Sequence, residues 1–278
     1  MVSFYAVSSE SDESRFFRVN RHALLWLIDH PWHFFPILLL GLLFCVNVGF
    51  HFRRRDERNL SQIESARDGL TVLLSLLLGF MLPMAHPHYD QRKELIVDEA
   101  NAISTVHLRA QMLPEPFRGK ILGELREYLN SRTDFGKEDL DEATLRASLA
   151  RSKQLLDEMQ QQAVALVEQS SNSVTPIFVQ ALNQLSDFTE KRLAAEENRI
   201  PTAIWLMVVL IAVLAGLITG YSIRYRHLVE MIVLPLTVAI VMALVAELDS
   251  PRTGFIQVGQ QSMERLQLEL SSAAPQPK

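Results

Sequence analysis

The feature that most constrains this chain is a long apolar run that contains no charge. It extends from residue 200 to residue 223. A bilayer core about 30 Å thick is crossed by roughly 20 helical residues, because each residue adds about 1.5 Å. Helices buried in soluble proteins are seldom free of charge on every face. The run therefore predicts a helix that spans a lipid bilayer.

Three further runs have nearly the same character, at residues 34–50, 69–85 and 228–246, the last with only Glu230 near its start. We therefore expect four transmembrane helices. The first run follows a polar segment that contains Glu10 and lacks a small-x-small cleavage site. It predicts a retained anchor and not a cleaved signal peptide.

The segment between the second and third runs is different. It is charged, poor in glycine and free of strand-like alternation, and its apolar residues fall at helical spacing. The sequence therefore predicts an all-α membrane protein with four transmembrane helices and a helical polar domain between the second and third. The expected segments are a polar N-terminal segment (1–30), transmembrane helices 1 and 2 (31–89), a helical extramembrane domain (90–199), transmembrane helices 3 and 4 (200–247) and a C-terminal tail (248–278).

Four helices are expected in and beside the polar domain. Pro114 and Pro116 separate the first two, because proline cannot continue a helix. The expected helices are residues 89–112, which continue from the second span, residues 117–131, residues 141–169, and a stretch from residue 176 toward the third span.

Small residues recur four apart in the predicted spans, and Gly216 and Gly220 form a G-x-x-x-G motif. Such spacing lets helix backbones approach closely, and close packing drives association in lipid. It predicts a compact bundle, a homo-oligomer, or both, although Gly and Ala are common in spans and chance is the alternative. The expected helix-packing residues are Gly41, Gly49, Ser75, Gly79, Gly216 and Gly220.

Composition excludes several classes of function. The net charge of -5, without a clustered basic patch outside the membrane flanks, argues against nucleic-acid binding. The single cysteine, Cys45, excludes a disulfide within one chain. The chain contains no catalytic motif, P-loop or dinucleotide fingerprint, so we expect neither an enzyme nor a cofactor. His86 and His88 at the membrane edge are a weak metal pattern, more typical of interfacial residues, and we expect no metal site.

Arginines cluster in the two short links between spans, at positions 53–55, 58, 224 and 226. The positive-inside rule would place both links in the cytoplasm of a bacterial inner membrane, with the polar domain on the other side. The segments on the other side also contain arginines, including Arg15 and Arg92. The two sides therefore differ only in how densely their arginines are spaced.

A polar stripe marks the helix expected at residues 89–112. Asp98, Asn101, Thr105 and Arg109 step by three or four and share one face. On a helix that leaves the membrane, this stripe fits the lining of a water-filled vestibule or ion path. A hydrogen-bonded contact with another helix, or a solvated face, fits the same spacing.

Two segments carry a family resemblance. One reads YDQRKELIVDEANAISTVHLRAQMLPEPFR and is followed by LREYLNSR; the other reads ELDSPRTGFIQVGQQSM. They resemble a bacterial membrane-protein family described as bestrophin-like, whose function is unknown. The resemblance covers about residues 66–270. Its most specific parts are Glu-Ala-Asn at 99–101 and Asp-x-Pro-Arg at 249–252, and Gly259 stands where a serine is expected.

The resemblance implies a function. Bestrophins are pentameric anion channels with four spans and a helical cytosolic region between the second and third. The resemblance therefore implies a homo-oligomer that binds a small anion. It also implies a cytoplasmic polar domain, whereas the arginines in the two short links favour the opposite side of the membrane. Their aromatic pore-neck motif is missing from GFMLPMAHPHYD in the second span, and no acidic calcium clasp is evident. No pore residue is therefore carried over. The alternative is a non-conducting membrane module whose helical domain binds a partner or senses the envelope.

Overall fold

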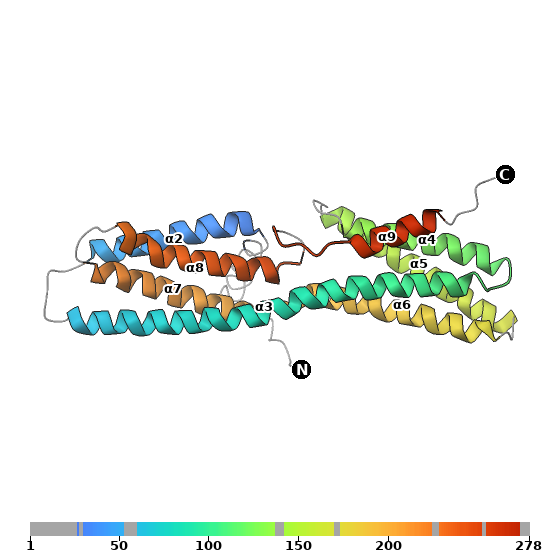
Figure 1. Ribbon diagram of the computed structural model, residues 1–278, viewed down its shortest axis with the longest axis horizontal. Helices are drawn as coiled ribbons and strands as arrows, with labels where there is room; N and C mark the ends of the chain where they lie inside the picture. The colour runs from blue at the N-terminus through green and yellow to red at the C-terminus, as the bar shows by residue number, and fades with distance from the viewer. Residues whose placement is uncertain are drawn as a thin grey trace, which may run out of the picture. The chain divides into compact units, whose positions relative to one another are not determined.

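A computed structural model describes residues 27, 30–52, 60–136, 142–169, 173–223, 228–251 and 254–272. The predicted N-terminal segment 1–30 and the arginines of both short links lie outside these residues, apart from positions 27 and 30. Over the described ranges the chain forms helices and no strand (Figure 1). The helices are α2 (Pro31–His51), α3 (Leu60–Ala110), α4 (Phe117–Phe135), α5 (Glu142–Gln169), α6 (Val174–Glu197), α7 (Thr202–Ser222), α8 (Leu228–Asp249) and α9 (Gln261–Ser272).

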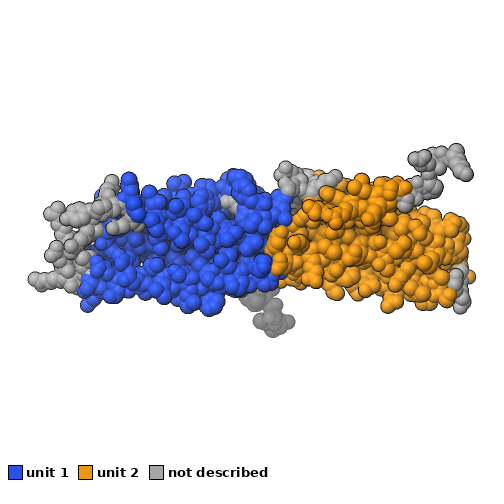
Figure 2. Space-filling model, viewed as in Figure 1, with its two compact units in different colours: residues 1–88, 199–257 blue, residues 89–198, 258–278 orange. Residues whose placement is uncertain are grey.

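This architecture confirms the predicted class. The protein is an all-α membrane protein with four transmembrane helices and a helical polar domain between the second and third. The chain divides into two compact units (Figure 2). Unit 1 contains residues 1–88 and 199–257, and unit 2 contains residues 89–198 and 258–278. Helix α3 is continuous and contributes its first part to unit 1 and its last part to unit 2.

Unit 1 is the membrane unit. Helix α2 packs against α7 and α8, and the start of α3 completes the core. Inside, the rings of Phe34 and Trp205 meet edge to face with centroids 5.7 Å apart. Outside, large apolar side chains such as Leu40, Phe44 and Val72 are more than half exposed. In water such a surface would be unfavourable, but lipid tails solvate it well.

The start of the third span shows how proline sets a helix boundary. Helix α6 ends at Glu197, and the chain is extended at Asn198 and Pro201 before α7 begins at Thr202. Proline before the first helical turn removes only a donor that would lack an intrahelical partner. The polar helix and the third span are therefore two helices.

Unit 2 is a helical domain around an apolar core. Helix α4 packs against α5 and α9, and α5 packs against α6. The side chains of Ile103, Ile121, Leu125 and Phe178 are completely buried in the core. The observed helices reproduce the sequence expectations to within a few residues, with α4 extending further, to Phe135.

Helix α9 is a feature that the sequence reading did not distinguish within the segment 248–278. Met263, Leu266 and Leu270 are buried on one face of this helix, against the core of unit 2. Their spacing of three and four residues is the helical pattern. The C-terminal segment therefore begins in unit 1 and returns to the polar domain.

Candidate functional site

Glu99, on α3, is a completely buried acidic residue of unit 2. Two arginines bind its carboxylate. Arg132 on α4 donates from Nε to Oε1 over 2.6 Å and from Nη2 to Oε2 over 3.1 Å. Arg192 on α6 donates from Nη1 to Oε2 over 2.7 Å. One carboxylate thus links three helices through charge-assisted hydrogen bonds, which are the strong class.

Two hydroxyl groups complete this arrangement. The hydroxyl of Tyr128 donates to Glu99 Oε1 over 2.8 Å and lies 2.7 Å from Thr189 Oγ1. The Arg132 guanidinium also lies over the ring of Phe135, 4.8 Å from its centroid. We call Glu99, Tyr128, Arg132, Thr189 and Arg192 the Glu99 network.

The charges around Glu99 keep its carboxylate ionised. Burial alone would raise the pKa of Glu99, because desolvation penalises the charged form. The positive charges of Arg132 and Arg192, and the hydrogen bonds from them, outweigh burial and lower this pKa to about 2. Burial and the neighbouring Glu99 charge raise the pKa of Tyr128, so its hydroxyl remains a donor. With two arginines and one carboxylate, the ionic groups of the network carry one net positive charge.

Two further buried acids, Glu247 and Asp249, lie in unit 1, at the end of α8. Asp249 is almost completely buried; its Oδ1 accepts from the backbone N–H of Ile200 over 3.0 Å and lies 3.2 Å from Nδ1 of His88. Glu247 is also buried, and its Oε2 accepts from the backbone N–H groups of Phe255 over 2.7 Å and Ile256 over 3.2 Å. These carboxylates therefore accept hydrogen bonds from backbone N–H groups that have no partner within a helix or a sheet.

The loop after α8 requires a glycine at position 254. Its φ is +123°, a conformation that L side chains rarely adopt. A Cβ at this position would also collide with the carboxylate of Glu247. The loop after α8 is therefore wrapped closely around one buried carboxylate. Arg252, the last residue of the Asp-x-Pro-Arg motif, lies outside the described residues.

Comparison with known proteins places this geometry in a family. Residues 68–263 match the Bestrophin-like domain family. The chain belongs to this bestrophin-like family. The predicted resemblance is thereby confirmed.

Solved structures agree with the assignment at the level of fold. A bacterial bestrophin homolog from Klebsiella pneumoniae matches with a TM-score of 0.63 and 15% identity, over 86% of this chain and 99% of that one. A mutant of the same homolog matches with a TM-score of 0.64 and 15% identity, over 86% of this chain and 97% of that one. No curated protein matches the chain by sequence.

The bestrophin-like signatures coincide with the buried acids. Glu99 opens the Glu-Ala-Asn motif, and Asp249 opens the Asp-x-Pro-Arg motif. The sequence reading selected both motifs by resemblance and did not identify the partners of Glu99. A usable signal was present, because Arg132 continues the buried face of α4 beyond Leu125 and Tyr128, and Arg192 follows Phe188 by four residues. A basic residue on an apolar helix face predicts a buried acidic partner.

The predicted polar stripe lies on the side of α3 that faces away from the core of unit 2. Asn101 is exposed, and Asp98, Thr105 and Arg109 are half-buried. Thr105 Oγ1 donates to the Asn101 carbonyl over 2.9 Å, within the helix. Arg109 Nη1 donates to the Ile177 carbonyl over 2.6 Å, which joins α3 to the first turn of α6. The structure therefore gives Arg109 a structural contact and leaves Asn101 open.

The predicted helix-packing residues of the bestrophin-like chain divide into two groups. At the contact of α2 with α7, a Cβ at Gly49 would collide with the Leu217 carbonyl, and one at Gly220 with the Val46 carbonyl. Gly216 lies at the same contact, where a Cβ would be 3.5 Å from Cβ of Cys45. The remaining members do not pack against a described helix at that position. Gly41 and Gly79 face open space, and Ser75 is exposed and donates to the Thr71 carbonyl.

Proposed function

We propose that the protein is a bestrophin-like anion channel, assembled from several copies in the bacterial inner membrane. In this proposal the polar stripe on α3 lines part of the conduction path. The observation that supports it most strongly is the placement of Asn101, which is exposed on a helix whose opposite face forms the core of unit 2. A polar face that the chain leaves open is available to water and ions.

The length of α3 adds to the argument. It has 51 residues, which at 1.5 Å each make a helix of about 77 Å. This exceeds the roughly 30 Å of a bilayer core, so one helix carries both an apolar span and a polar stripe beyond it. One such stripe cannot enclose a pore, whereas a closed ring of identical copies can.

The chemistry of the stripe suits a small anion. The side-chain amide of Asn101 offers N–H donors, and Arg109 adds a positive charge, although Asp98 opposes it. The family supports the same conclusion, because bestrophins are anion channels.

The competing function is a non-conducting membrane module whose helical domain binds a partner. It is favoured by the residues in the second span, where the aromatic pore-neck motif of bestrophins is missing. Conduction and partner binding make different predictions for purified protein, and a flux experiment separates them.

The test is chloride flux through liposomes that contain the purified protein. We expect flux above that of empty liposomes, and we expect Asn101→Asp to lower it about threefold to tenfold, because a negative charge in the path repels anions. Asn183→Asp is the matched control, since Asn183 is exposed on α6. Unchanged flux in Asn101→Asp would exclude the stripe from the path, and absence of flux would favour the module.

A further inference from the structure

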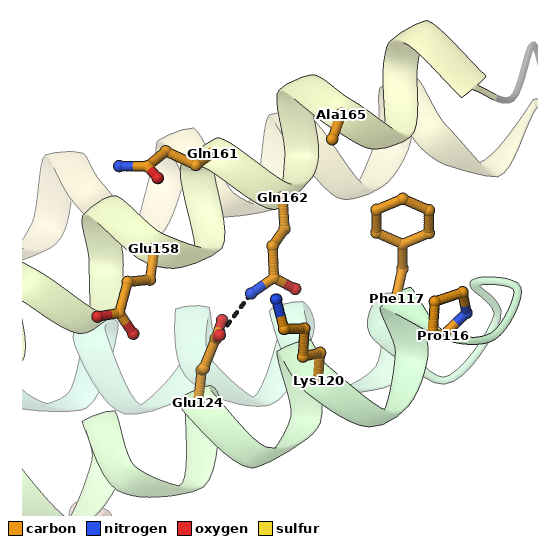
Figure 3. Close-up of a pocket in the computed structure, with 8 residues that line it drawn as sticks. All are labelled: Pro116, Phe117, Lys120, Glu124, Glu158, Gln161, Gln162 and Ala165. Carbon is orange, nitrogen blue, oxygen red and sulfur yellow. Dashed lines mark hydrogen bonds between the residues drawn. The ribbon is translucent and has the colours of Figure 1, made fainter.

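The pocket of unit 2 that lies between α4 and α5 offers no binding group that a ligand could reach (Figure 3). Gln162 donates from Nε2 to the carboxylate of Glu124. The other two oxygens, Gln162 Oε1 and Glu124 Oε2, have almost no accessible surface, so a molecule in the pocket does not touch them. The ammonium group of Lys120 is a donor of the chain itself. A pocket in unit 1 is different in kind.

This second pocket is apolar, and it lies where α2 and α7 end and α3 begins. These three helix ends meet at one end of unit 1 (Figure 1). The volume of the pocket is about 360 Å³, and among the described residues only apolar atoms line it. We call it the α2–α7 pocket. Its walls include Val48 and Phe52 of α2, Ile63 and Ala66 of α3, and Ile218 and Tyr221 of α7.

The surroundings of the α2–α7 pocket determine what fills it. Water is a poor occupant, because a buried water molecule needs about two to four polar partners. An empty pocket is also unfavourable, because the atoms of its walls lose their dispersion contacts. The three helices that form the pocket are transmembrane helices, and lipid tails solvate their exposed faces. An alkyl chain is therefore the occupant that the walls favour.

Polar residues begin directly beside this apolar surface. Ala66 is followed by Arg67 and Asp68, whose side chains pair over 2.8 Å, and Gln62 is exposed one turn earlier on α3. The ring of Tyr221 is half-buried at the end of α7, and tyrosine is enriched at membrane–water interfaces. The pocket therefore opens where lipid tails meet headgroups. This change from apolar to polar matches a phospholipid better than an alkyl chain alone.

The charge of the adjoining sequence favours one type of headgroup. The link that follows Phe52 contains four arginines and two acids, and the link that follows α7 contains two arginines and no acid. Both links lie outside the described residues, so this argument uses only their charge. Basic residues next to a transmembrane helix attract anionic lipids. Charge complementarity therefore favours an anionic phospholipid over a zwitterionic one.

We propose that the α2–α7 pocket holds one acyl chain of an anionic phospholipid, whose headgroup lies beside the ends of α2 and α7. The acyl chain packs against Ile63 and Ile218, and the second chain of the lipid remains in the bilayer. Lipid tails and detergent tails pack against an apolar wall about equally well. The charge of the headgroup therefore decides which molecule stays bound.

The test uses the full-length protein in detergent, and native mass spectrometry measures the lipids that stay bound. The probes are phosphatidylglycerol, which is anionic, and phosphatidylcholine, which is zwitterionic, with identical acyl chains. We expect phosphatidylglycerol to bind at least about tenfold more tightly, because only its headgroup has a net negative charge. Equal binding of the two lipids would overturn the proposal.

A variant that fills the pocket locates the binding site. Ala66 is exposed at the mouth of the pocket, so the ring in Ala66→Phe takes the place of the acyl chain without displacing the core. It should weaken phosphatidylglycerol binding about tenfold. Ala203→Phe is the matched control, because Ala203 is exposed at the opposite end of α7, and it should bind the lipid as the wild type does.

If Ala66→Phe does not fold, Ala66→Leu replaces it, with an expected weakening of about threefold. Unchanged affinity in the folded variant would overturn the proposal. A variant that changes the number of chains in the particle but not the lipid affinity would also overturn it, because a second copy would then cover the pocket. These measurements do not involve ion flux, so their outcome is independent of the proposed channel function.

Discussion

The two units differ in what holds their helices together. Unit 1 has large exposed apolar side chains and an apolar core, with the buried acids Glu247 and Asp249 only at the end of α8, and at the contact of α2 with α7 it relies on backbone approach at Gly49 and Gly220. Unit 2 has an apolar core that also encloses the Glu99 network. The difference follows from the solvent. Lipid tails give little drive to bury apolar side chains, so close packing decides, whereas water drives apolar burial and leaves buried charges in need of partners.

The two kinds of contact differ in how they fail. A backbone contact fails by steric overlap, at one residue and over a short range. A buried ion network fails when one member is removed, because the remaining charges stay buried without a partner. The comparison therefore predicts a larger effect for a single substitution in unit 2 than for one in unit 1.

The largest effect is expected for Glu99→Gln. It keeps the shape of the side chain but removes the carboxylate that Arg132 and Arg192 share, and we expect a loss of about 3–5 kcal/mol in the free energy of unfolding. Urea unfolding of the full-length protein in detergent, followed by circular dichroism, measures it. Glu127→Gln is the matched control, because Glu127 is exposed and pairs with Arg151; it should lose at most about 1 kcal/mol. Equal losses in both variants would contradict a special role for Glu99.

A pH effect of similar size is expected in the wild type. The pKa of Glu99 is lowered from 4.5 to about 2 in the folded state, so the charged form contributes stability above pH 4.5. This contribution, about 3 kcal/mol, should be lost as the pH falls from 4.5 toward 2. Urea unfolding at a series of pH values measures the loss. In Glu99→Gln the same pH range should lack this component, and parallel curves for the two proteins would refute the assignment.

A smaller effect is expected in unit 1 from Gly220→Ala. The added methyl group overlaps the Val46 carbonyl, so α2 and α7 must separate, at about 1–3 kcal/mol. Gly41→Ala is the matched control in a neighbouring span, with nothing within 4 Å of the added methyl group, and it should change stability by less than about 0.5 kcal/mol. The melting temperature of each variant in detergent shows which substitution destabilises the protein more. A neutral Gly220→Ala would show that the helix contact is loose.

Much of this architecture was predictable because hydropathy and helical spacing are local signals. The runs at 34–50 and 228–246 correspond to α2 and α8, and the polar helices were predicted within a few residues. Helix α9 was not distinguished, because three leucine-like positions in a polar segment are a weak pattern until a partner surface is known.

The candidate sites were less predictable, because their members are distant in sequence. Arg192 lies 93 residues after Glu99, and no local pattern pairs them. The same limit applies to Gly254, whose positive φ and close approach to Glu247 depend on the folded loop. By contrast, Asp98 and Asn101 were grouped by helical spacing alone, and that grouping says which face they share but not what they contact.

The separation of Glu99 from Arg192 also has a consequence for biosynthesis. A ribosome adds about 5–20 residues per second, so Glu99 is made roughly 5–20 seconds before Arg192, the second of its two cationic partners. Throughout that interval two spans are already synthesised while their polar extension cannot close. Arg192 is followed ten residues later by α7, so translation delivers the last member of the Glu99 network just before the third span.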